Sequence, residues 1–82
     1  MQTNQPRDLS EVLDRMIVEI GAGRPYLREQ LNKLKSSIAY TPPEGMYMRW
    51  EQGAQILEEW FQGASPESDW GQKLVDIWMG KL

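Results

Sequence analysis

The chain has 82 residues, with no cysteine and no histidine, and its 12 acidic residues outnumber its 9 basic residues to give a net charge of -3. This length suits one small domain, and the missing residue types exclude disulfides, thiolate nucleophiles, imidazole bases and ordinary zinc sites. A protein that coats phosphates usually carries the opposite charge, so nucleic acid is disfavoured as a partner.

Residues 1–7 predict a flexible N-terminal tail, because they contain no periodic apolar positions and Pro6 opposes an early helix. Residues 8–82 predict a single helical domain. The N-terminus lacks the apolar stretch of a signal peptide, and no apolar run approaches the length of a membrane span. We therefore expect a soluble, cytoplasmic protein that does not enter a membrane.

A first helix is expected over residues 9–20, where apolar residues recur at spacings of three and four. Asp8 and Glu11 resemble a capping box at its start, and Gly21 is suited to end it. A second helix is expected over residues 25–39, with Pro25 in its first turn. It carries a narrow apolar seam with spacings of four, three and four residues: Leu27, Leu31, Leu34 and Ile38.

A third helix is expected over residues 43–62. Counted from Thr41 as the N-cap, a proline is at N1 and Glu44 at N3, which is a helix-start signature. Gly45 weakens the first turn, so a start near Met46 is the alternative. Gly63 would be its C-cap.

A fourth helix is expected over residues 66–79, with Ser65 as N-cap, Pro66 in the first turn and Gly80 at the end. No segment alternates apolar and polar residues as a strand would. The sequence therefore predicts an all-α domain, a small four-helix bundle with short connections.

The chain carries no recognisable catalytic motif, since neither Gly-x-Ser-x-Gly nor Ser-x-x-Lys occurs. Glu44, Glu51 and Glu58 are spaced seven residues apart, about 10 Å along a helix, which is too far for their carboxylates to share one metal ion. We therefore expect no catalytic, cofactor or metal site, and we do not expect an enzyme.

The large aromatic residues are concentrated in the second half, which holds all four tryptophans and the one phenylalanine. Core packing is the first interpretation of each tryptophan. The apolar arcs of the third and fourth helices are nevertheless wide, and several apolar residues project outside them. Surplus apolar surface with a charged rim is typical of an interface.

We therefore expect a protein–protein interaction module, such as a small regulator, inhibitor, adaptor or assembly factor, which binds another protein or a second copy of itself. The predicted apolar patch consists of Met48, Ile56, Trp60, Trp78 and Met79. The predicted acidic rim, which would orient the partner, consists of Glu51, Glu58 and Glu59.

Two further hypotheses stay open at this point. A small DNA-binding regulator would use the one basic cluster, which is made of Arg24, Arg28, Lys33 and Lys35. A helical carrier would instead enclose a ligand in a cavity lined by methionine and tryptophan. Tyr26, Tyr40 and Tyr47 are expected near the junction of the second and third helices, where two or more of them would pack on Pro42 and Pro43; a ligand groove of stacked tyrosines is the alternative.

Overall fold

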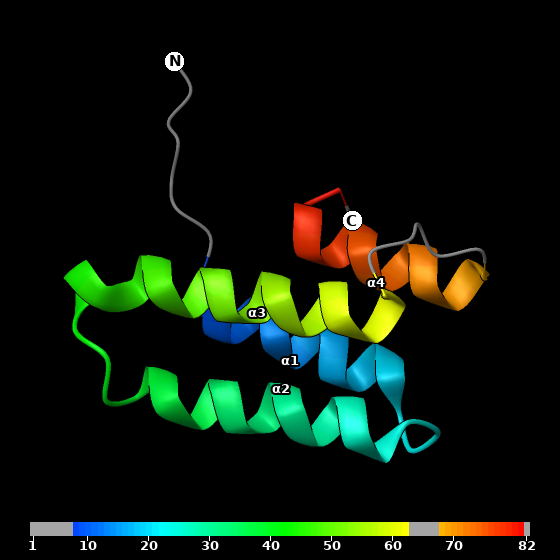
Figure 1. Ribbon diagram of the computed structural model, residues 1–82, viewed down its shortest axis with the longest axis horizontal. Coiled ribbons are helices and arrows are strands. Elements are labelled where there is room, and N and C mark those ends of the chain that lie inside the picture. The colour runs from blue at the N-terminus through cyan, green and yellow to red at the C-terminus, as the bar shows by residue number, and fades with distance from the viewer. Residues whose placement is uncertain (1–7, 63–67, 82) are drawn as a thin grey trace.

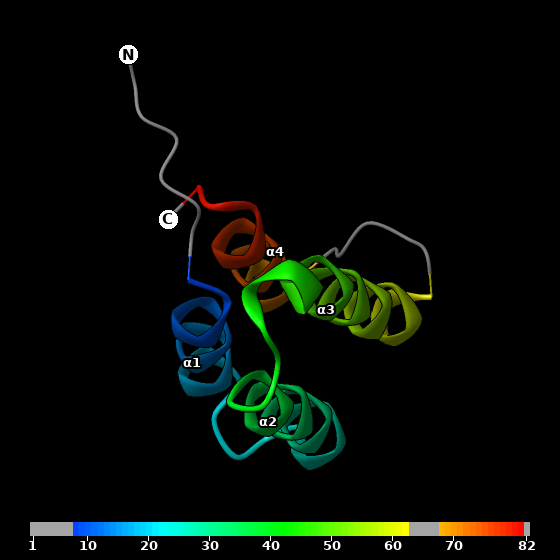
Figure 2. The same ribbon diagram turned by 90° about the vertical axis from the view of Figure 1, so that its left-hand side faces the viewer.

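The computed structural model describes residues 8–62 and 68–81, and the regular structure within them is entirely helical. The elements are α1 (Leu9–Ile20), α2 (Pro25–Ile38), the short 3-10 turn η1 (Pro43–Gly45), α3 (Met46–Phe61) and α4 (Asp69–Met79). Consecutive helices run in opposite directions (Figure 1), and seen end-on they surround a shared centre (Figure 2). The predicted all-α four-helix bundle is confirmed.

The core is built where these helices meet: α1 packs against both α2 and α4, and α2 packs against α3. No polar or charged side chain is buried within the described part of the chain. The predicted leucine seam of α2 faces this core, with Ile38 half-buried at its end. The buried apolar residues are Leu9, Val12, Leu13, Met16, Ile20, Leu27, Leu31, Leu34, Leu57, Leu74 and Ile77.

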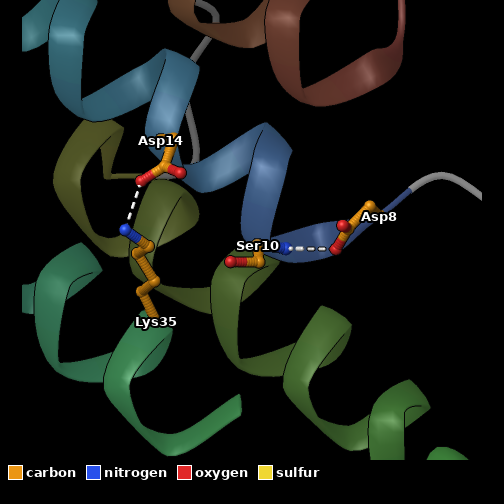
Figure 3. A network of polar contacts seen from close by, with 4 residues as sticks. All are labelled: Asp8, Ser10, Asp14 and Lys35. Carbon is orange, nitrogen blue, oxygen red and sulfur yellow. Dashed lines mark hydrogen bonds and ion pairs between the residues drawn. The ribbon is translucent and has the colours of Figure 1, made fainter. Parts of the chain in front are cut away.

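Helix α1 begins and ends where its capping residues predict. The Asp8 carboxylate accepts a hydrogen bond of 3.0 Å from the Ser10 amide, and Gly21 ends the helix with a φ of 64°. Asp14 forms an ion pair with Lys35 of α2 (Figure 3), which links the two helices at the surface.

The start of α3 differs from the first expectation and agrees with the alternative start at Met46. Thr41 is not the N-cap, because its hydroxyl donates to the Ser37 carbonyl at 2.7 Å and accepts from Arg49 Nε at 2.9 Å. Its side chain therefore closes the end of α2 instead of starting α3. Pro43–Gly45 forms the 3-10 turn between them.

Helix α4 begins at Asp69, three residues later than predicted, and its cap is Ser68 rather than Ser65. The Ser68 hydroxyl accepts a hydrogen bond of 3.0 Å from the Gly71 amide. Gly80 ends the helix as expected, with a φ of 81°. Helix α3 is capped at its C-terminal end by Gln62, one residue before the predicted cap Gly63. The predicted tail, and Gly63, Ser65 and Pro66, lie outside the described residues.

Aromatic side chains fill the space between α3 and α4. Trp50 and Trp78 lie with ring centroids 5.1 Å apart, and Phe61 and Trp70 with centroids 6.3 Å apart. All four tryptophans are half-buried and pack against the core. The concentration of aromatic residues in the second half of the sequence is thus explained largely by the α3–α4 contact.

Candidate functional site

A groove runs along the surface between α2 and α3 and consists of two adjoining hollows of about 360 and 390 Å³. Gln30, Ile56 and Glu59 line both hollows, so the groove is continuous. The first hollow is also lined by Tyr26, Leu27, Trp60 and Gln62. The second is also lined by Lys33, Leu34, Ser37, Arg49, Gln52 and Gln55.

The walls of the groove follow from the helical repeat of each core seam. In α2, the wall residues immediately precede the seam residues Leu27, Leu31, Leu34 and Ile38, and are Tyr26, Gln30, Lys33 and Ser37. In α3, the core-facing positions are 50, 53, 57 and 60, and the wall residues that precede them are Arg49, Gln52, Ile56 and Glu59. A residue one position before a buried one lies about 100° around the helix, at the edge of the packed face.

The end of the groove near the α2–α3 connection is held by polar contacts. Arg49 donates from Nε to the Thr41 hydroxyl and from a terminal nitrogen to the Gln52 side-chain carbonyl, both at 2.9 Å. Ser37 donates its hydroxyl proton to the Leu34 carbonyl at 2.7 Å. Arg49 is therefore fixed in place by uncharged groups, and its positive charge stays beside the groove.

The opposite end is aromatic and acidic. Tyr26, in the first turn of α2, is 65% exposed, and Trp60, in the last turn of α3, is half-buried. Gln62 ends α3 in the left-handed conformation, with a φ of 56°, and lines the same hollow. The Glu59 carboxylate accepts a hydrogen bond of 3.2 Å from the Gln55 amide and belongs to no ion pair among the described residues.

The structure brings together only part of the patch that the sequence predicts. Ile56, Glu59 and Trp60 line one hollow. Glu58 and Glu51 are exposed, but at about 100° per residue they lie about 160° and 180° around α3 from Trp60. These two carboxylates therefore belong to the far side of the helix and do not form a rim for this groove.

The other three predicted patch residues lie outside the groove. Trp78 packs on Trp50 and Gly53, in the contact between α3 and α4. Met48 is 50% exposed and Met79 is 58% exposed, and neither lines the groove. The predicted patch is therefore divided between the groove, the α3–α4 packing and separate exposed positions.

The four residues of the predicted basic cluster do not all lie on one face of α2. Arg24 is half-buried, with its guanidinium carbon 3.6 Å from the centroid of the Trp70 ring. Lys35 pairs with Asp14 of α1, and Lys33 pairs with Glu29 at 3.9 Å. At about 100° per residue, Arg24, Arg28 and Lys35 lie within about 40° of one another around α2, whereas Lys33 lies about 140° from Arg28. Of the three aligned cations, Arg24 and Lys35 already contact Trp70 and Asp14.

The tyrosines do not pack as the sequence analysis expects. Tyr40 is 89% exposed and Tyr47 is 64% exposed, so neither is packed away at the Pro42-Pro43 corner. Tyr26 lies at the opposite end of α2, beside Trp60 in the groove. The sequence analysis did not identify Tyr26, Gln30 and Gln62 as groove residues. A signal existed for Tyr26 and Gln30, because the wall residues of α2 repeat the four-three-four spacing of the leucine seam one position earlier in the chain.

No family model matches the chain, and no curated protein and no solved structure matches it. Within residues 8–62 and 68–81, no helix combines the length and hydropathy that crossing a membrane requires. The same residues contain no group of three or more histidine, cysteine or acidic side chains arranged to hold a metal ion.

Proposed function

We propose that this chain is a non-enzymatic protein–protein interaction module, and that the α2–α3 groove is its docking surface. The observation that carries the proposal is the position of Ile56 and Trp60, two large apolar side chains half-exposed along one continuous groove. Aromatic anchors of this kind contribute much of the binding energy in protein interfaces.

The shape and chemistry of the groove support a segment of a partner protein as its occupant. Buried Leu27 and Leu34 form an apolar floor, and the glutamines along the walls can both donate and accept hydrogen bonds. An amphipathic helix binds such a groove through apolar residues on one face. A cytoplasmic setting stays part of the proposal and is in keeping with the absence of cysteine from the sequence.

Two exposed tyrosines provide a matched test of the docking surface. Tyr26 lines the groove, whereas Tyr40 lies beyond the end of α2 and outside both hollows. Tyr26→Glu places a charge in the groove without disturbing the core, and Tyr40→Glu makes the same change elsewhere. The test is affinity capture from cells that express the chain, with the bound proteins quantified by mass spectrometry. We expect a partner protein that binds the parent chain and Tyr40→Glu but does not bind Tyr26→Glu.

Light scattering across a dilution series then distinguishes the two kinds of partner. A mass of twice 9.5 kDa that falls to the monomer in Tyr26→Glu would identify the partner as a second copy. If Tyr26→Glu binds every protein that the parent captures and has the same mass as the parent by light scattering, the groove is not the docking surface and the proposal fails.

A further inference from the structure

The aromatic end of the groove has the composition of a receptor for an organic cation. Tyr26 and Trp60 come from different helices and line one hollow of about 360 Å³. Glu59 is the one charged residue among the described residues that line this hollow. Among the residues that the structure describes, the lining of the hollow therefore combines two aromatic side chains with one acidic side chain and includes no lysine or arginine.

We propose that this hollow receives an arginine side chain of the partner protein, with its guanidinium group against Tyr26 and Trp60 and hydrogen-bonded to Glu59. This inference rests on the proposed function, because it names the chemistry of the partner at the same surface. The faces of aromatic rings attract cations, and a carboxylate accepts two parallel hydrogen bonds from a guanidinium group.

The polar groups of the hollow favour arginine over lysine. A guanidinium group carries five N–H donors in one plane. Gln30 and Gln62 also line the hollow, and their side-chain amides can supply acceptors in addition to the Glu59 carboxylate. A planar cation stacks on an aromatic ring more closely than an ammonium group does. This chain already contains one such contact, between the Arg24 guanidinium and Trp70, with 3.6 Å from the guanidinium carbon to the ring centroid.

The charge of Glu59 is available for a partner. Its carboxylate accepts a hydrogen bond from the neutral amide of Gln55, but it forms no ion pair with a described residue. Leu27 and Ile56 also line the hollow, so a bound guanidinium group would lie partly against apolar residues. Glu59 itself is exposed, so its ion pair with the guanidinium group should contribute modestly to binding and weaken with salt.

The test uses N-acetyl-arginine N-methylamide as the probe and the corresponding citrulline compound as its neutral isostere. The intact chain is labelled with ¹⁵N, and each probe is titrated while the indole N–H resonances are recorded, with the Trp60 resonance identified by its loss in Trp60→Phe. We expect saturable shifts of the Trp60 resonance with the arginine compound at millimolar concentration, and no saturable shift with the citrulline compound.

Glu59→Gln and Glu58→Gln are a matched pair of variants, because they remove the same charge from neighbouring exposed positions of α3. Glu58 lies about 160° around the helix from Trp60 and does not line the hollow. We expect Glu59→Gln to weaken binding of the arginine compound about three- to fivefold, and Glu58→Gln to leave it unchanged. Higher salt should weaken binding to the parent more than to Glu59→Gln.

Equal binding of the arginine and citrulline compounds would overturn the proposal, and so would equal effects of the two glutamine variants or the absence of any saturable shift. These outcomes are distinct from failure of the proposed function. If Tyr26→Glu still abolishes partner capture while the arginine compound does not bind, the groove is a docking surface for a partner without this arginine, and only the present inference is lost.

Discussion

The indole ring of Trp78 lies against Gly53, at the point where α4 packs on α3. A Cβ atom placed on Gly53 would lie 2.5 Å from Cη2 and 2.9 Å from Cζ3 of that ring. Gly53 is in the middle of α3, where glycine lowers helix stability by about 1 kcal/mol relative to alanine. Its role is therefore to leave room for the ring.

Gly53→Ala should destabilise the domain by about 1–2 kcal/mol. Overpacking of a filled core costs about 1–3 kcal/mol, and the gain in helix propensity offsets only part of this loss. Urea unfolding followed by circular dichroism would measure the change. Gly23→Ala is the control, since no heavy atom lies within 4 Å of its added Cβ atom, and it should be neutral or slightly stabilising. A Gly53→Ala variant as stable as the parent would show that Trp78 moves away at no cost.

Ser68→Ala should cost about 1 kcal/mol, because the Ser68 hydroxyl accepts the hydrogen bond from the Gly71 amide at the start of α4. Thermal unfolding would measure the loss. Ser36→Ala, at an exposed position within α2, removes a hydroxyl that caps no helix and should be neutral or slightly stabilising. Ser65→Ala should also be neutral. If Ser65→Ala proves the more damaging change, the cap predicted from the sequence is the correct one.

The sequence predicts the fold well because most of its helix signals are local. The start of α1 at Asp8, its end at Gly21 and the seam of α2 all depend on residues within a few positions of one another. The start of α4 was predicted wrongly, because Ser65 and Ser68 both carry a hydroxyl that can cap a helix and Ser65 was chosen for the proline that follows it. Thr41 was wrongly predicted as the N-cap of α3 for a different reason. Its hydroxyl accepts a hydrogen bond from Arg49, and this contact forms only when α3 packs against α2.

The candidate site is only partly predictable, because it depends on how neighbouring helices are rotated. The predicted apolar patch included Ile56 and Trp60, and both line the groove. It also placed Trp78 on the surface, because nothing local shows that the missing side chain of Gly53 creates space for that ring. Tyr26 was missed since its partner in the hollow, Trp60, lies far along the chain.

Lys35→Gln should change the free energy of unfolding by less than about 1 kcal/mol, although Lys35 forms an ion pair with Asp14 between α1 and α2. The side chain of Lys35 is 38% exposed and that of Asp14 is 54% exposed, so water and salt screen their interaction. Urea unfolding at low and high salt would measure the effect, with Lys33→Gln as a control for loss of one charge. A larger loss confined to Lys35→Gln would show that this pair is important for holding α2 against α1.

Trp70→Phe should cost less stability than Trp78→Phe, although both replace a half-buried indole of α4. The Trp70 Nε1 atom is buried and has no hydrogen-bond partner among the described residues, and a buried unpaired donor costs about 1–3 kcal/mol. Phenylalanine removes that donor while it keeps an aromatic ring beside Phe61 and Arg24. The free energy gained by removing the unpaired donor should offset most of the free energy lost with the packing of the larger ring. The net change in the free energy of unfolding should therefore lie within about 1 kcal/mol.

Trp78→Phe has no such compensation. It shortens the ring that fills the space at Gly53 and should cost about 2 kcal/mol or more through the cavity that it leaves. Urea unfolding of the two variants beside the parent would compare them directly. If the two variants lose equal amounts of stability, the Trp70 indole N–H has a hydrogen-bond partner in solution. Replacing Trp70 with phenylalanine would then remove no unpaired donor.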